Sequence, residues 1–510
     1  MKRVLISLLA LALCAAAFPL LFAGAQDAPQ TRRRPFARPE KSLDQLVRRH
    51  ERLKLNPAVA ARKVRAGGGL SIATPEHQFE LDLTPNDLRA PGYRAEATDE
   101  YGVRRPLVES GPVRTYKGSV RGQAKAVARF TVDDETVEGM ILTPEERYYV
   151  EPLSKYEPEA EATDFILYKR SDVIEGADQM CGTMDGEVGE AMKGVISQFA
   201  ATTEPSAVVG IMYEAEIATE ADYAYYQKLG TADAANAEIM STMNQVDGVY
   251  EAELNISLKV VYQHVWTGTP TSTYPYGTSV GDKLLEKFTN YWNANFTSVH
   301  RDLAHLWTGQ NIVDPFNDPN LIGIANPGTV CGNPPFAYSL SERMTTAANR
   351  AILAAHEIGH NFGATHQCEG TIMNSFLSGT TLTFCPSSRT QIAAFLDINS
   401  SCLTQSCSPA ISPAALSFPA AGGTGSVSVA TTASCSWAAK SNVPWIVVNS
   451  GASGSGNKTV GYTVAVNPDP LTRTGTLTIA GKTHTVTQGP ATVLSRLALN
   501  LTTVPGGKKV

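Results

Sequence analysis

The spacing of hydrophobic and polar positions changes several times along the chain, and each change predicts a different kind of region. From His77 to Leu153, apolar and polar residues alternate between turns rich in Pro, Gly and Asp, as in Phe79–Leu83 and Ala128–Val132. Such alternation over a few residues predicts half-buried strands. We therefore expect a β-rich first region. Residues 26–75, rich in Arg, Pro, Ala and Gly, are expected to precede it as a loosely ordered leader.

A different pattern begins near residue 208, after an exposed connection expected over residues 183–206. Val208–Tyr213 and Ile256–Val265 have the apolar runs of strands, whereas Glu220–Val249 and Gly281–Asn293 have helical spacing. Strands that alternate with helices predict an α/β layered domain.

The last pattern covers Ser408–Gln488, which is rich in Ser, Thr, Val and Gly and contains short alternating runs such as Thr459–Val464. Many short strands between Gly and Pro turns predict a small all-β, immunoglobulin-like sandwich. The chain is therefore expected to be multidomain. The expected boundaries are 1–25, 26–203, 204–407, 408–489 and 490–510, where the last segment is a tail or the start of a further segment.

Composition and the N-terminus indicate an exported protein. Of the 510 residues, 43% are hydrophobic and 18% charged, which is typical of folded domains, and a net charge of -6 gives no indication of a nucleic-acid partner. Lys2 and Arg3 precede an apolar run and a small-residue site that ends at Ala25. This order predicts a signal peptide cleaved after Ala25, and a membrane anchor is the alternative. No later stretch is long and apolar enough to span a bilayer.

Eight cysteines are present, and loss of Cys14 with the signal peptide would leave seven. Six can pair in an oxidising compartment, and one remains. Cys181 is the candidate for the unpaired thiol, because it stands far from the others in the sequence. Spacing alone does not fix how the remaining six cysteines pair.

Three of the nine histidines lie close together, in the sequence HEIGHNFGATH. Residues 345–362 contain no proline and predict a helix, so His356 and His360, four residues apart, share one face. Gly363 tolerates the left-handed conformation that ends a helix, which lets the chain turn and bring His366 to the same ion.

Three imidazoles are the donor set of a catalytic zinc ion, because they leave a fourth position open for water. Glu357, next to His356, can hold that water, accept its proton as general base, and deliver the proton to a leaving amine. The pattern therefore predicts one catalytic Zn²⁺ ion and the hydrolysis of peptide bonds. A helix that only carries surface histidines is the alternative interpretation.

The extended histidine motif is similar to that of the metzincin metallopeptidases. Met373 stands where those enzymes have a methionine turn beneath the metal, although ordinary core packing is an alternative for a single methionine. Residues 208–402 resemble the reprolysin (adamalysin, ADAM-like) branch. The resemblance implies a mixed twisted sheet, a long active-site helix and, around Gly323, an edge strand that pairs with extended peptide substrates. The residues that carry it are Gly323–Cys331, His356–His366, Cys368, Ile372–Met373 and Phe384–Ser387.

This resemblance also implies two disulfides, Cys331–Cys402 and Cys368–Cys385. Spacing leaves Cys402–Cys407 open as an alternative pair. The chain departs from the branch at Gln367, where an Asp is usual, and has fewer cysteines between Cys368 and Cys385. It lacks a Tyr just after Met373, which counts against the astacin branch.

The segment Gln179–Gly182, which reads QMCG, resembles the cysteine switch of reprolysin precursors, and Tyr116–Gly122 and Tyr149–Pro152 are similar to their prodomains. The resemblance implies that the Cys181 thiolate fills the position that water needs until residues 26–203 are removed. We expect a maturation cut within residues 183–206. A free or mispaired thiol is the alternative.

Residues 408–488 resemble a BACON domain, a module of secreted bacterial proteins. The resemblance implies a Cys407–Cys435 disulfide, a bacterial source and an attachment role, with glycan or mucin as a candidate ligand. Trp437 and Trp445 are candidates for sugar platforms or for core aromatics. The residues that carry the resemblance are Gly422–Gly425, Cys435–Trp437, Trp445–Ile446, Gly454–Gly456, Arg473–Thr476 and Val486–Gln488.

Together these patterns predict a secreted, latent zinc endopeptidase that acts on extracellular proteins or peptides. The alternatives are a catalytically inactive adhesin that binds carbohydrate or mucin, and a metzincin of another branch. The sequence does not indicate the natural substrate.

Overall fold

The computed structural model of the chain describes residues 41–491, except 108–110, 175, 177, 184–209, 271–272, 333–335, 378 and 434. The expected signal peptide, nearly all of the expected maturation segment and most of the expected tail lie outside the described residues.

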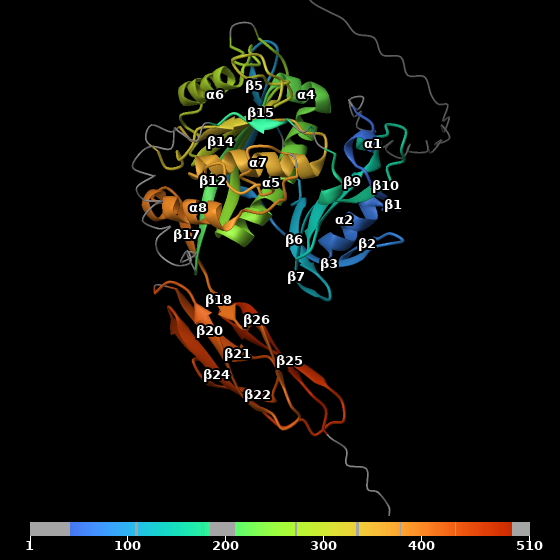
Figure 1. Ribbon diagram of the computed structural model, residues 1–510, viewed down its shortest axis with the longest axis vertical. Helices are drawn as coiled ribbons and strands as arrows, with labels where there is room; N and C mark the ends of the chain where they lie inside the picture. Colours follow the sequence, from blue (N-terminus) through green and yellow to red (C-terminus); the bar gives the residue numbers. More distant parts are fainter. Residues whose placement is uncertain are drawn as a thin grey trace, which may run out of the picture. The chain divides into compact units, whose positions relative to one another are not determined.

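Residues 41–183, called here the N-terminal region, form mainly an antiparallel sheet with the strand order β1-β10-β9-β8-β7-β6-β3-β2 (Figure 1). Its apolar face packs around Phe130, Ile141 and Leu167. The β-rich first region expected from the alternating pattern is confirmed. The elements are α1 (Leu43–Leu46), β1 (Glu51–Lys54), α2 (Pro57–Arg65), β2 (Leu70–Ala73), β3 (Gln78–Pro85), β6 (Thr115–Val120), β7 (Gln123–Val132), β8 (Val137–Leu142), β9 (Arg147–Pro152) and β10 (Asp164–Lys169).

The prediction of a loosely ordered leader is wrong for residues 41–75, which form α1, β1, α2 and β2. Asn56 caps helix α2, because its side chain accepts a hydrogen bond from Val59 N, and Pro57 occupies the first turn. Ala61 and Val64 are buried, and Arg65 lies in the last turn, where a cation favours the helix dipole. The basic residues that suggested disorder therefore form the outer face of an ordered helix.

The following α/β domain is built on a mixed sheet with the strand order β11-β15-β16-β14-β12-β13-β4-β5, and β17 pairs with β12. Strands β12, β13, β14 and β16 run parallel, and β15 runs antiparallel to β16. Helices α5 and α7 pack against each other and share one buried apolar cluster, whereas α6 packs in a second cluster (Figure 1). The elements are β11 (Met180–Cys181), β12 (Gly210–Ala221), α4 (Tyr223–Leu229), α5 (Ala232–Leu254), β13 (Ile256–Trp266), α6 (Gly281–Asn295), β14 (Leu303–Thr308), β15 (Leu321–Ala325), β16 (Tyr338–Glu342), α7 (Ala347–Asn361), α8 (Pro386–Asn399) and β17 (Thr404–Ser408).

The predicted strand and helix between residues 208 and 249 have different limits in the structure. Strand β12 continues to Ala221, and the helical segment is divided at Gly230, which has a φ of 79° and caps α4. Thr231 then caps α5 by accepting a hydrogen bond from Ala234 N. Helical periodicity continued across this break because both helices bury apolar side chains.

Besides β11, the α/β sheet contains two more strands from the N-terminal region, β4 (Arg89–Thr98) and β5 (Arg104–Pro106). Strand β4 runs parallel to β13, from the pair Arg94 and Tyr262 to the pair Thr98 and Trp266. The sequence was divided at residue 203, but the sheet takes strands from both sides of that division.

The C-terminal residues form two sheets, with the orders β18-β20-β24-β22 and β19-β26-β25-β21-β23. Trp437 is buried and donates to Gly456 O, so it is a core aromatic. The Arg473 guanidinium lies over the Trp445 ring, 4.2 Å from its centroid. The strands are β18 (Ala410–Ser412), β19 (Ala415–Phe418), β20 (Gly423–Ala430), β21 (Ser436–Ser441), β22 (Ile446–Ser450), β23 (Ser453–Ser455), β24 (Lys458–Val464), β25 (Arg473–Ile479) and β26 (Lys482–Gln488).

Across the described parts of the chain, we find no helix that combines the length and the apolar character needed to cross a membrane.

Candidate metal centre

The three histidines of the motif converge at the C-terminal end of helix α7. His356 and His360 lie one turn apart on this fully buried helix, and their Nε2 atoms are 3.0 Å apart. The helix ends at Asn361, and Gly363 has a φ of 83°, the left-handed conformation expected from the sequence. The chain then returns, so the His366 ring centroid lies 4.8 Å from that of His360.

Hydrogen bonds on the outer nitrogens orient two of these rings. His356 Nδ1 lies 2.5 Å from Ile372 O, and His360 Nδ1 lies 2.7 Å from Ala364 O. A carbonyl partner fixes the proton on Nδ1 and leaves Nε2 with its lone pair directed inward. Burial lowers the pKa of His356 to about 3 and the pKa of His360 well below its ordinary value. Both imidazoles are therefore neutral, as metal ligands must be.

The donor set fits one zinc ion. Cys181 Sγ joins the three histidines, and the ligand atoms of all four residues lie within 4.8 Å of one another. Cys181 Sγ is 3.6 Å from His360 Nε2. Zinc–nitrogen bonds of about 2.0–2.1 Å in a tetrahedron place ligand atoms about 3.4 Å apart. The distance between the Nε2 atoms of His356 and His360, 3.0 Å, and the distance from Cys181 Sγ to His360 Nε2, 3.6 Å, are close to this value. Three nitrogens and one sulfur are also ligands that zinc prefers.

Glu357 lies at the same point, between the histidines and strand β15. Its side chain is completely buried, and burial raises its pKa well above the ordinary value. One carboxylate oxygen is 3.5 Å from Cys181 Sγ, and the other has no hydrogen-bond partner among the described residues. A Cβ atom added at Gly323 of β15 would lie 2.2 Å from Glu357 Oε1. The strand therefore needs a glycine here, a requirement that sequence reasoning missed because Gly323 was read only as part of an edge strand.

Met373 lies beneath the helix at the level of the histidines. It is fully buried, and a Cβ atom added at Gly359 would lie 2.7 Å from its sulfur. Its carbonyl accepts a hydrogen bond from Gln367 N, 2.9 Å away. The adjacent carbonyl, of Ile372, is the one that holds His356. The turn around Met373 thus packs against helix α7 at Gly359 and holds the His356 ring through the Ile372 carbonyl. Gln367 is linked to it through backbone atoms.

The segment Gln179–Thr183, called here the strap, lies between β15 and residues 375–377. On one side, its strand β11 runs parallel to β15, and Gly182 N donates to Gly323 O at 2.9 Å. On the other side, Cys181 N donates to Ser375 O, and Leu377 N donates to Gln179 O. The strap therefore occupies the edge of β15 and presents the buried Cys181 thiol to the three histidines.

The structure contains three disulfides: Cys331–Cys402, Cys368–Cys385 and Cys407–Cys435. These are the three pairs that the family resemblances implied, and the alternative pair Cys402–Cys407 is wrong. Cys181 is the free cysteine of the described residues.

Comparison with known families agrees with this geometry. Residues 213–409 match the reprolysin-type model of metallo-peptidase family M12, and residues 409–495 match the model of the viral BACON domain. The second match is described as viral, so it does not support the bacterial source implied by the resemblance. Family M12 enzymes are zinc endopeptidases. The three histidines of the donor set lie within the matched residues, and the fourth member, Cys181, lies in the strap. The chain thus contains a segment that matches metallo-peptidase family M12, followed by a segment that matches a BACON domain.

Proposed function

We propose that this protein is a secreted zinc endopeptidase of the reprolysin type that Cys181 keeps latent. The observation that carries the proposal is the convergence of three histidine nitrogens, one thiol and the Glu357 carboxylate at one buried point. His356, His360 and His366 would hold the ion. An inactive adhesin would not need a carboxylate beside three converging histidines.

The residues of the centre supply the remaining parts of a hydrolytic mechanism. Zinc, when bound, supplies Lewis-acid polarisation of the scissile carbonyl and acidifies water. Glu357, once the thiol has left, orients the attacking water, accepts its proton and delivers it to the leaving amine. The β15 edge, which the strap now occupies, would pair with the backbone of an extended peptide. Ile322, Leu353 and Leu377 line a small pocket beside Cys181 and His356.

Latency follows from the position of the strap. Cys181 Sγ lies within 4 Å of both Glu357 and His360, where the attacking water would have to enter. The backbone hydrogen bonds of the strap also occupy the β15 edge needed by substrate. A cut between Thr183 and Gly210 would free the end of the strap. Export is supported by the signal-like N-terminus and by the three disulfides.

The test compares Glu357→Ala with Glu369→Ala, an exposed glutamate near the motif, in protein freed of the strap. Hydrolysis of casein and of a peptide library should require metal and stop on chelation. Glu357→Ala should lose about 10²–10⁴-fold in kcat while retaining one zinc per chain by elemental analysis. Full activity in Glu357→Ala would exclude its role as general base. Zinc-loaded protein without any hydrolysis would favour the adhesin alternative.

A further inference from the structure

We infer that the N-terminal region is a permanent structural part of the enzyme and stays bound to the α/β domain after a cut between Thr183 and Gly210. This inference rests on the proposed maturation cut, but it changes the consequence of that cut. Activation would then require the strap to leave the cleft, whereas residues 41–174 would remain in place.

The first observation is the shared sheet. Strand β4 forms the parallel neighbour of β13 and covers what would otherwise be an open edge. Side chains reinforce the pairing: the Tyr93 hydroxyl donates to Gln263 at 2.6 Å, and Thr98 Oγ1 lies 2.8 Å from His264 Nε2. His264 is fully buried in this position. Loss of the N-terminal region would therefore remove a strand from the sheet that carries the site.

The second observation is a shared apolar core. A single buried cluster includes Met140, Tyr149 and Ile166 of the N-terminal region together with Ile239 of α5 and Ile352 of α7. Removal of the N-terminal region would expose this apolar surface to water. Large exposed apolar patches are uncommon on soluble monomers, so the surface requires a partner. In this chain the N-terminal region is that partner.

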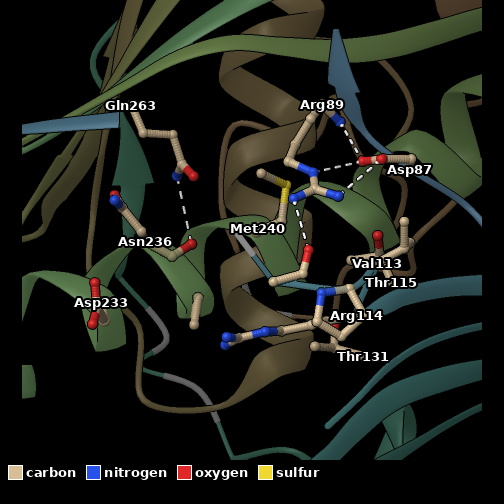
Figure 2. Close-up of a pocket in the computed structure, with 13 residues that line it drawn as sticks. Asp87, Arg89, Val113, Arg114, Thr115, Thr131, Asp233, Asn236, Met240 and Gln263 are labelled. Atoms are coloured by element: carbon tan, nitrogen blue, oxygen red, sulfur yellow. Dashed lines mark hydrogen bonds and ion pairs between the residues drawn. The ribbon is translucent and has the colours of Figure 1, made fainter. Parts of the chain in front are cut away.

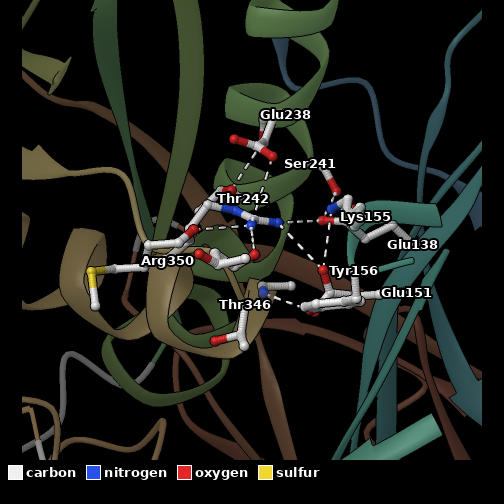
Figure 3. Close-up of polar contacts among 12 residues, drawn as sticks. Glu138, Glu151, Lys155, Tyr156, Glu238, Ser241, Thr242, Thr346 and Arg350 are labelled. Atoms are coloured by element: carbon white, nitrogen blue, oxygen red, sulfur yellow. Dashed lines mark hydrogen bonds and ion pairs between the residues drawn. The ribbon is translucent and has the colours of Figure 1, made fainter. Parts of the chain in front are cut away.

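The third observation is a buried ionic network at the start of the active-site helix (Figure 3). Arg350 of α7 is 1% exposed, and its Nη2 lies 2.9 Å from Glu138 of β8 and 3.8 Å from Glu151 of β9. Glu151 also accepts a hydrogen bond from Ala347 N, in the first turn of α7. Burial opposes ionisation of Glu151, but Lys155 and Arg350 more than offset it and lower its pKa. The N-terminal region thus caps the helix that carries the histidines.

The charges of this network balance only when both parts are present. Glu138 and Glu151 come with Lys155 from the N-terminal region. Arg350 and Arg343 come with Glu238 from the α/β domain. Separation would leave one excess positive charge on the α/β side and one excess negative charge on the other. Buried charges without partners are strongly unfavourable, so the network opposes separation.

The boundary is less complete near the first turns of α5. A cavity of about 130 Å³ lies there between Asp87 and Arg89 of the N-terminal region and Asn236 and Met240 of α5 (Figure 2). The Arg89 guanidinium is held by Asp87 of its own region. This end therefore contributes less to retention than the Arg350 network does.

The test uses the full chain with Glu357→Ala, which prevents self-digestion, and with a site for a sequence-specific protease inserted between residues 184 and 209. After cutting, the protein is diluted to nanomolar concentration and followed by size exclusion and native mass spectrometry. We expect both pieces in one complex with the mass of the uncut chain. Separate elution of the two pieces in native buffer would overturn the inference. The readout is mass and needs no hydrolysis, so it remains valid if the proposed function fails.

Variants test whether the ionic network holds the complex. Glu151→Gln should raise the dissociation rate of the cut complex by about a hundredfold or more, because it removes one partner of a buried ion pair. Glu157→Gln is the matched control, since its ion pair with Arg52 is exposed and lies within the N-terminal region. If Glu151→Gln does not fold, Glu138→Gln, which loses the pairs with Lys155 and Arg350, replaces it. Equal dissociation rates for variant and control would show that the network does not retain the N-terminal region.

Discussion

The contact between Gly323 and Glu357 gives a sharp test of the site geometry. In Gly323→Ala, the new Cβ atom would lie 2.2 Å from Glu357 Oε1, 2.8 Å from its Cδ and 3.0 Å from its Cγ. Ordinary contacts of a Cβ atom begin at about 3.4 Å. Since β15 is held by β16 on one side, the carboxylate is the part that must move, by about 1 Å.

A shift of this size has a predictable cost for catalysis. Misplacement of a catalytic group by about 1 Å lowers the rate on the order of a hundredfold, which is about 2.7 kcal/mol in activation free energy. The three heavy atoms nearest to the new methyl group all belong to Glu357 and none to a histidine. We therefore expect kcat to fall about a hundredfold while the zinc content stays at one ion per chain.

The assay is hydrolysis of a fluorogenic peptide by protein freed of the strap, with zinc content measured in parallel. Gly277→Ala is the matched control, because no atom lies within 4 Å of a Cβ atom added there. An unchanged kcat in Gly323→Ala would show that Glu357 does not act from the position seen against β15, and would refute the reasoning.

Three further predictions concern other parts of the molecule. Cys181→Ala should give the uncut chain measurable peptidase activity, although less than the cut protein, because the backbone bonds of the strap remain; an inactive uncut variant would assign latency to the backbone alone. Gly359→Ala should press on the Met373 sulfur and lower the unfolding free energy by about 1–3 kcal/mol, measured by urea denaturation; unchanged stability and zinc affinity would contradict the support assigned to Met373. Burial lowers the pKa of His305 to about 3, so unfolding between that pH and about 6.5 takes up a proton. In metal-free protein, stability should therefore fall with falling pH by about 1.4 kcal/mol per unit more than in His305→Gln, and equal slopes would contradict this assignment.

The chemistry of the centre was predictable from the sequence because its determinants are local. His356, Glu357 and His360 follow one another on a single helix, whose geometry fixes which side chains share a face. Gly363 ends that helix in the left-handed conformation that glycine tolerates best, so the return of His366 is also a local property. The alternation of strands and helices predicted the α/β domain for the same reason.

What the sequence left undecided depends on contacts between distant segments. Arg350 and Glu138 are 212 residues apart, and nothing in the pattern around either residue indicates its partner. The approach of Glu357 to Gly323, and the order of α1 and α2 within the supposed leader, likewise appear only when separate elements pack together. Thus the sequence by itself predicted the candidate metal ligands and the candidate general base. Only the tertiary structure decided that the N-terminal region completes the catalytic sheet, because strand pairing and buried charge balance are properties of the assembled core.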